Sequence, residues 1–155
     1  MKSPAATHIG FATSLELERN LVRDFITLLQ KEQNNLIQGI TDKTDSLTLS
    51  KSQLVQELAQ FGEQRNHYLL SQGLTPDNKG MNAWLEKHAD QHTTDTWFDL
   101  IQVARTAHRL NLTNGKIIES RLQHCRRACS TLQQAAGATM LYGPEGHHQV
   151  LGIAS

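Results

Sequence analysis

The stretch that decides the fold is residues 97–136, which read WFDLIQVARTAHRLNLTNGKIIESRLQHCRRACSTLQQAA. Twelve positions in it follow one another at spacings of four and three, which is the heptad pattern of a helix that packs against a neighbour. They are Trp97, Ile101, Ala104, His108, Asn111, Gly115, Ile118, Leu122, Cys125, Cys129, Leu132 and Ala136. At 1.5 Å per residue, a helix over this stretch is about 60 Å long. Residues 93–96 offer capping side chains at its start, and Gly137 offers a stop.

The rest of the chain also favours helices. Proline occurs only at positions 4, 76 and 144, so two long stretches contain no obligatory helix breaker. Leucine occurs 21 times against 12 for isoleucine and valine together, which favours helix over strand. We therefore predict an all-α fold, an elongated antiparallel bundle with coiled-coil-like packing and helices at about 15–39, 45–71, 81–90 and 95–136. Residues 1–14 and 137–155 are expected to be flexible ends.

The first proline-free stretch carries two apolar stripes with polar interruptions. One stripe has Gln33 within it, and the other has Lys51 and Arg65 in its seam. Residues 39–45 are poor helix formers, which predicts a tight reversal there, and the alternative is one bent helix. The stripes consist of Val22, Ile26, Leu29, Leu36 and Ile40, and of Leu47, Leu54, Leu58, Phe61 and Tyr68.

Charge and hydropathy exclude several classes of protein. Fifteen basic and fifteen acidic residues balance, so the overall charge does not favour nucleic acid or an acidic membrane as the partner. No apolar run approaches the roughly 18 residues that a membrane span needs, and residues 1–14 lack the apolar centre of a signal peptide. We expect a cytoplasmic protein with no stable membrane insertion and with reduced cysteines.

The sequence offers little chemistry. His124, Cys125 and Cys129 could present three ligands on one turn of helix, but no second ligand pair completes a site, and both cysteines lie on the apolar heptad positions. No nucleophile or phosphate-binding motif is present either. We predict no metal, no cofactor and no catalytic residues, and a metal or redox protein built on the cysteines remains an alternative.

Residues 101–155 hold six basic and two acidic groups, so the last third of the chain is positive. A nucleic-acid-binding regulator would use this basic helix. The helix lacks interleaved aromatic residues and a recognition motif, so we expect no nucleic acid among the partners and keep the regulator as the alternative function.

Four residues in the middle of the long helix are predicted to act in helix packing. His108 and Asn111 are polar at heptad positions, and Asn114-Gly115 continues the pattern through a pair that is more typical of a turn. Polar groups buried between helices must be hydrogen bonded, and in coiled coils they set the register. Gly115 is expected to mark a close approach of a neighbouring backbone.

The same segment resembles a known family. Asn111-Leu-Thr-Asn114-Gly115-Lys-Ile117-Ile118, followed by Leu141-Tyr142-Gly143-Pro-Glu-Gly146, resembles the FlgN family of flagellar export chaperones. The resemblance extends upstream and covers roughly residues 15–146. The upstream residues that carry it are Glu32, Leu36, Leu47, Lys51, Leu54, Leu58 and Arg65.

The resemblance implies a cytoplasmic, non-enzymatic chaperone. One partner would be the hook-associated proteins: the chaperone would bind their C-terminal amphipathic segments and keep these proteins from assembling prematurely. The other partner would be the export gate of the flagellar type III secretion apparatus. Tyr142, with Leu141 and Gly143, matches the tyrosine that flagellar chaperones present to the gate. A heptad face suits a helix-in-groove complex with such cargo, and homodimerisation is the alternative use of that face. The expected cargo-binding residues are Ile118, Leu122, Cys125, Cys129 and Leu132.

Overall fold

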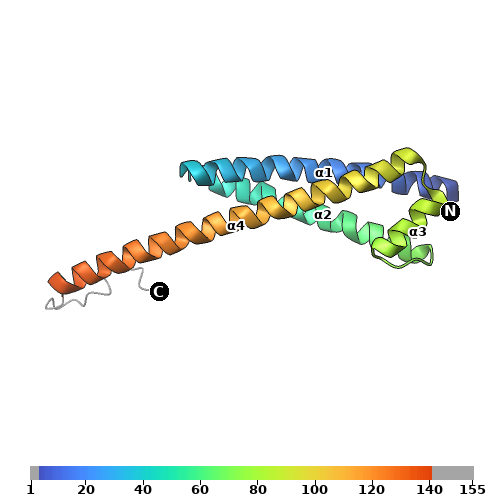
Figure 1. Cartoon of the computed structure of the whole chain (residues 1–155). Coiled ribbons are helices and arrows are strands. Elements are labelled where there is room, and N and C mark those ends of the chain that lie inside the picture. Colours follow the sequence, from blue (N-terminus) through green and yellow to red (C-terminus); the bar gives the residue numbers. More distant parts are fainter. Residues whose placement is uncertain (1–3, 141–155) are drawn as a thin grey trace. The chain divides into compact units, whose positions relative to one another are not determined.

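The computed structural model describes residues 4–140, with side chains from residue 10 to residue 137. Four α-helices make up most of this range: α1 (Pro4–Gln38), α2 (Thr44–Ser71), α3 (Asn78–His88) and α4 (Gln91–Met140) (Figure 1). No strand occurs between residues 4 and 140, so the predicted all-α class is confirmed. The chain divides into two units, and Asn114 is the last residue of the first.

The helix bounds differ from the expected ones mainly at the two ends of the chain. The segment expected to be flexible, 1–14, is helical from Pro4 onward, because proline in a first turn lacks only an N–H that needs no helical partner. Gly137 lies inside α4, which continues to Met140, since a single glycine costs a helix only about 1 kcal/mol. The remainder of the expected tail, 141–155, lies outside the described residues.

Glycines in the left-handed conformation end the first two helices. Gly39 has φ 71° and Gly73 has φ 73°, values that residues with a Cβ rarely adopt. After α1, the N–H of Ile40 donates to the carbonyl of Asn35 at 2.9 Å. After α2, Leu74 donates in the same way to Leu69. Both are the hydrogen bonds of a Schellman cap, and the cap after α1 turns the chain sharply enough for α2 to return along α1.

The short helix α3 begins at a tightly built turn. The Asp77 carboxylate accepts hydrogen bonds from the Thr75 hydroxyl at 2.5 Å and from the backbone N–H of Gly80 at 2.9 Å. The hydroxyl of Thr75, followed by the amide of Gly80, lowers the pKa of Asp77 below its usual value. A Cβ on Gly80 would lie 1.8 Å from the carbonyl oxygen of Thr75, so only glycine fits this turn.

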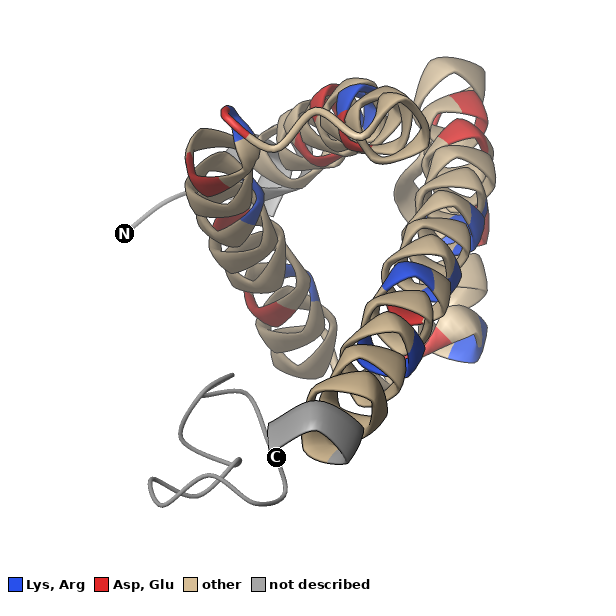
Figure 2. Ribbon diagram, turned by 90° about the vertical axis from the view of Figure 1, so that its left-hand side faces the viewer, with Lys and Arg blue, Asp and Glu red and all other residues tan. Residues whose placement is uncertain are grey.

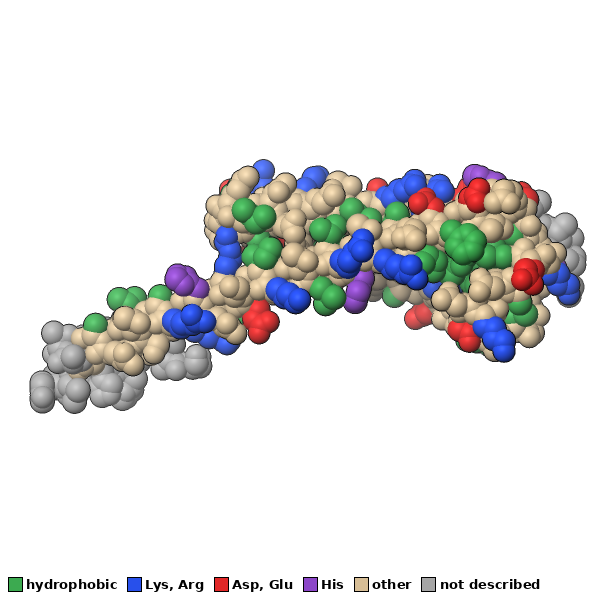
Figure 3. Space-filling view, in the orientation of Figure 1, with side chains coloured by type: hydrophobic (Ala, Val, Ile, Leu, Met, Phe, Trp, Pro, Cys, Tyr) green, Lys and Arg blue, Asp and Glu red, His purple; other side chains and the backbone are tan. Residues whose placement is uncertain are grey.

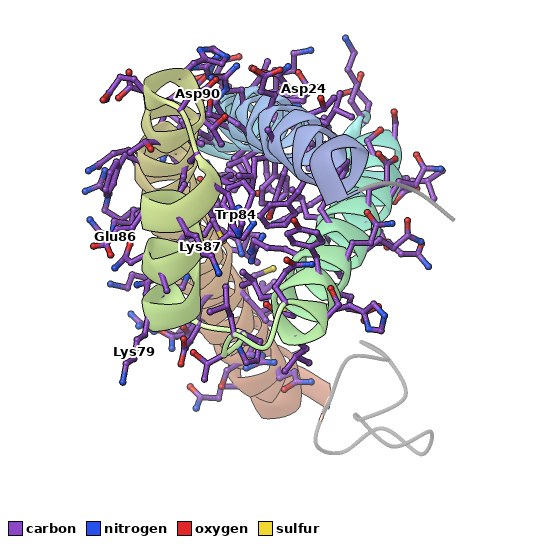
Figure 4. All side chains as sticks on the ribbon, turned by 90° about the vertical axis from the view of Figure 1, so that its right-hand side faces the viewer. Asp24, Lys79, Trp84, Glu86, Lys87 and Asp90 are labelled. Atoms are coloured by element: carbon purple, nitrogen blue, oxygen red, sulfur yellow. The ribbon has the colours of Figure 1, made fainter. Side chains whose placement is uncertain are left out.

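The hydrophobic core of the first unit is richest around α3. Trp84 is 1% exposed; its indole N–H donates to the Tyr68 hydroxyl at 3.2 Å, and its ring meets Phe11 edge-on at 4.8 Å. Burial raises the pKa of Tyr68 above its usual value. Figure 4 shows Trp84 directed into the bundle, whereas Lys79 and Glu86 of the same helix point outward. The buried apolar residues are Phe11, Leu15, Val22, Phe25, Leu29, Leu69, Met81, Trp84, Leu85, Trp97, Leu100 and Ala107.

The bundle-facing stripe of α4 lies one position away from the predicted seam. Leu100 and Ala107 are buried, whereas His108 and Asn111 are exposed. A heptad pattern alternates spacings of three and four residues, so the next position after Trp97 on the same helix face can be 100 or 101. α4 carries apolar residues along both of the resulting rows, or tracks. The prediction that His108 and Asn111 pack between helices is therefore wrong.

The predicted close approach at Gly115 is also wrong. Gly115 is exposed, and a Cβ built on it would meet no atom of the described residues within 4 Å, apart from its own helix and chain neighbours. The helix passes through Asn114-Gly115 without a turn, since its hydrogen bonds continue on both sides of the glycine. Gly115 therefore costs the helix some stability and makes no tight contact in return.

Candidate functional site

Two ion pairs lie inside the contact between α1 and α2. Lys51 Nζ lies 3.2 Å and 3.3 Å from the two carboxylate oxygens of Glu32, and Arg65 pairs with Glu18. The side chains are mostly shielded, from 10% exposed for Glu18 to 24% for Lys51. On each helix the two charged residues are 14 positions apart, which is two heptads. The pairs therefore fix the antiparallel register of α1 and α2.

Asn114 of α4 joins the pair of Glu32 and Lys51. It is 0% exposed, and its side-chain amide donates to the carbonyl oxygen of Leu29 and to the Glu32 carboxylate, both at 2.9 Å. Glu32 thus accepts from Lys51 of α2 and from Asn114 of α4. The Asn114 Oδ1 is buried without a donor among the described residues. We call Glu32, Lys51 and Asn114 the polar anchor; it joins the three long helices at the last residue of the first unit.

Arg65 links the other ion pair to α4. Its guanidinium carbon lies 5.5 Å from the centroid of the Trp97 ring, which is itself 5% exposed. A guanidinium over an indole is attracted by the negative face of the ring. Arg23 of α1 also pairs with Asp99 of α4 at 2.5 Å. Along the sequence, Arg23 of α1 pairs with Asp99 of α4, and Leu29 of α1 accepts from Asn114 of α4. The two helices therefore run in the same direction, and in Figure 1 the colours of both progress from right to left.

The second unit, as far as the structure describes it, is the helical segment 115–140. Its apolar side chains at heptad spacing are exposed: Ile118 is 44% exposed, Leu122 47% and Leu132 59%. Cys125 is exposed and Cys129 half-buried. These five residues, which we call the C-terminal stripe, are the expected cargo-binding residues. An apolar row on a helix in water is a surface suited to docking.

The segment also carries charge and two thiols. Lys116, Arg121, Arg126 and Arg127 outnumber the single Glu119, and Figure 2 shows Lys and Arg recurring along α4. Among the side chains that the structure describes, those of residues 10–137, no group of three His, Cys, Asp or Glu could hold a metal ion. In the same range, no helix has both the length and the apolar character needed to cross a membrane.

Comparison with known proteins identifies the relatives of this chain. The sequence model of the family described as FlgN protein matches residues 10–149, which is most of the chain. The chain belongs to the FlgN family. Two relatives, both named Flagella synthesis protein FlgN, come from Yersinia enterocolitica, one of them from strain NCTC 13174 / 8081 of serotype O:8 / biotype 1B. Each is 27% identical over 139 residues, which cover 87% of this chain and 86% of the relative. No solved structure matches significantly.

The fold explains part of the sequence pattern by which the family was recognised. Glu32, Lys51 and Asn114 come from three separate helices and meet in the polar anchor. Arg65 belongs to the second ion pair. Leu141, Tyr142 and Gly143, expected to dock on the export gate, lie outside the described residues.

Sequence reasoning missed Glu18 and the role of Trp97 as the partner of Arg65. A usable signal was present, because Glu18 and Glu32 repeat the 14-residue spacing of Lys51 and Arg65 on the opposing helix. Acidic residues in one seam at the spacing of basic residues in the other predict paired layers. Trp97 could not be found in this way, because its partner depends on how α4 crosses the other two helices.

Proposed function

We propose that this FlgN-family chain is a non-enzymatic cytoplasmic chaperone of flagellar type III export. In this proposal it binds the C-terminal amphipathic segments of hook-associated proteins, prevents their premature assembly and delivers them to the export gate. The observation that carries the proposal is the exposed C-terminal stripe, whose residues follow the heptad spacing of a helix that pairs with another helix.

Physical chemistry supports this use of the stripe. An exposed leucine gains about 1.5–3 kcal/mol when it is fully buried, so a few such residues provide useful affinity. Cargo must later be released, which requires moderate affinity, and a row of side chains on a single helix offers less contact area than a closed pocket. The names of the Yersinia relatives, which refer to flagella synthesis, agree with this role.

Co-elution on size exclusion tests the proposal with C-terminal segments of hook-associated proteins from the same organism. The full chain should form a discrete complex, and the double variant L122E/L132E should bind at least about tenfold more weakly. The double variant L49E/L70E makes the same chemical change at exposed leucines of α2. It should bind like the unchanged chain, and equal loss in both variants would contradict a specific stripe.

Docking on the gate is assigned to Leu141, Tyr142 and Gly143 through the resemblance to flagellar chaperones. Tyr142→Ala should therefore still co-elute with cargo while secretion of the hook-associated proteins into the medium falls. A variant that loses both properties would place Tyr142 in cargo binding instead.

The basic residues of segment 115–140 support the alternative function of a nucleic-acid-binding regulator. Retention of the full chain on heparin or DNA that falls steeply with salt would favour it. It would replace the chaperone proposal if no hook-associated segment co-elutes with the folded chain.

A further inference from the structure

The first unit carries an open groove along α4 that the bundle leaves unfilled. One part, of about 480 Å³, is lined by Asn78, Ile101, Ala104, Arg105, His108 and Arg109. A second part of about 240 Å³ shares Asn78, Ile101 and Arg105 and adds Asn82, Trp97, Phe98 and Gln102. The shared residues make the two parts one trough, which we call the α4 groove. It runs along about three turns of helix, from Phe98 to Arg109.

The α4 groove follows a heptad track that the bundle uses only in part. α4 packs into the bundle through Leu100 and Ala107. Ile101 of the neighbouring track is partly buried against the same core, whereas Ala104 and His108 of that track are exposed. The spacing of that track is still the spacing of a helix–helix contact. Ala104 is small and exposed at its centre, which lets another helix approach closely.

Beside this track lies an exposed aromatic side chain. Phe98, which lines the second part of the groove, is 56% exposed. In Figure 3 hydrophobic side chains gather over the beginning of α4 beside α3, with Lys and Arg side chains next to them on α4. The surface therefore combines an apolar floor with a charged rim.

The charged side chains that line the two parts are arginines. Arg105 and Arg109 line these two parts, and neither makes an ion pair with any residue between 10 and 137. An adjoining hollow that shares Asn78, Trp97 and Ile101 is also lined by Asp77, whose carboxylate already accepts hydrogen bonds from Thr75 and Gly80. The Arg109 guanidinium donates to the Thr106 hydroxyl of its own helix at 3.3 Å. The nearest acidic side chain along α4, Asp99, is already paired with Arg23 of α1. Two arginines beside an apolar floor complement a helix that is apolar on one face and acidic on its flanks.

We propose that the α4 groove is a second docking surface, which takes an acidic amphipathic helix of a partner protein. The partner helix lays its apolar face on Phe98, Ile101 and Ala104, and its carboxylates pair with Arg105 and Arg109. This surface is distinct from the C-terminal stripe, because all its residues lie in the first unit. The inference does not rest on the identity of the cargo.

Fluorescence anisotropy on the full chain tests the proposal. The probe is a labelled helical peptide of roughly 18 residues, about 27 Å long, with leucines on one face and glutamates on its flanks. A matched peptide carries lysine in place of each glutamate. We expect the acidic peptide to bind at least about tenfold more tightly than the basic one and to weaken as salt is added.

Two variants locate the binding site. R105E/R109E should weaken the acidic peptide at least about tenfold, and A104E should do the same by filling the groove while keeping a good helix former. The matched control R126E/R127E makes the same change of net charge in segment 115–140. Equal loss in R126E/R127E would overturn the proposal, because net charge alone would then explain binding.

Two further results would overturn it by naming another occupant. A dimer of the unchanged chain that A104E converts to a monomer, measured by light scattering, would assign the groove to a second copy of the chain. Peptide binding that tightens more than about tenfold in a chain ending at Met140 would assign it to residues 141–155. Loss of peptide binding in L122E/L132E but not in R105E/R109E would place the peptide on the C-terminal stripe and would also overturn the proposal. The chaperone proposal is tested separately, by co-elution with hook-associated segments, so the two proposals can fail separately.

Discussion

The first unit and segment 115–140 use the same heptad spacing for opposite purposes. In the first unit, apolar residues such as Leu29 and Leu100 are buried, and the charges within the seams are paired. In segment 115–140, Leu122 and Leu132 stay about half exposed. Spacing therefore determines which side chains share a helix face, and only the presence of an opposing helix determines whether that face becomes a core or a docking surface.

The largest expected effect contrasts a buried side chain of the first unit with an exposed side chain of segment 115–140. Trp84→Ala should destabilise the chain by about 3–5 kcal/mol, because it removes a buried ring that contacts Phe11 and Tyr68. Leu132→Ala should change stability by no more than about 0.5 kcal/mol, because its side chain is 59% exposed. Urea unfolding followed by circular dichroism measures both, and similar losses would show that the C-terminal stripe packs in the free protein.

A smaller effect is expected at the boundary of the first unit. Asn114→Ala should cost about 1–3 kcal/mol, since it removes two hydrogen bonds and leaves Glu32 with Lys51 as its remaining partner. Asn111→Ala, one turn earlier and exposed, should stay within about 0.5 kcal/mol. Urea unfolding of the two variants checks the difference, and the reverse order of losses would restore the seam predicted from the sequence.

The smallest effect has the opposite sign. Gly115→Ala should stabilise α4 locally by up to about 1 kcal/mol, because alanine is the better helix former and its Cβ enters open space. Slower amide hydrogen exchange in residues 115–137 is the measurement. Gly80→Ala is the contrasting glycine variant and should destabilise α3, since its Cβ would collide with the Thr75 carbonyl. Faster exchange in the Gly115 variant would mean that another backbone does approach there.

The sequence was sufficient to predict the helical class and the seam of α2. Its residues at positions 47, 51, 54, 58, 61, 65 and 68 are all partly buried, as the stripe through Lys51 and Arg65 indicated. The predicted seam omits Leu69, which is 1% exposed and lies next to the seam position Tyr68. α4 has two tracks that share Trp97, and the choice between them depends on where Glu32 and Leu29 of α1 lie. That information is tertiary, and for this reason His108 and Asn111 were misplaced.

The candidate site was predictable to a similar extent. The spacing located the C-terminal stripe, but the α4 groove followed only once the bundle had taken the other track of α4. The polar anchor lies between these cases, because its three residues were noticed through the family resemblance, while their contact required the fold. The 14-residue spacing on α1 and α2 links Glu32 to Lys51, whereas no periodic signal links Asn114 to either of them.

The burial of Asn114 has a further consequence for the chemical lifetime of the protein. In a flexible chain an asparagine followed by glycine is prone to deamidation: the glycine nitrogen attacks the side-chain carbonyl carbon, ammonia leaves, and water opens the resulting ring to a carboxylate. In α4 that nitrogen belongs to the helical hydrogen-bond ladder, and the side chain is held by Leu29 and Glu32. The folded bundle therefore preserves this amide. A chain that ages while unfolded would acquire a negative charge beside Glu32 and would refold without its polar anchor.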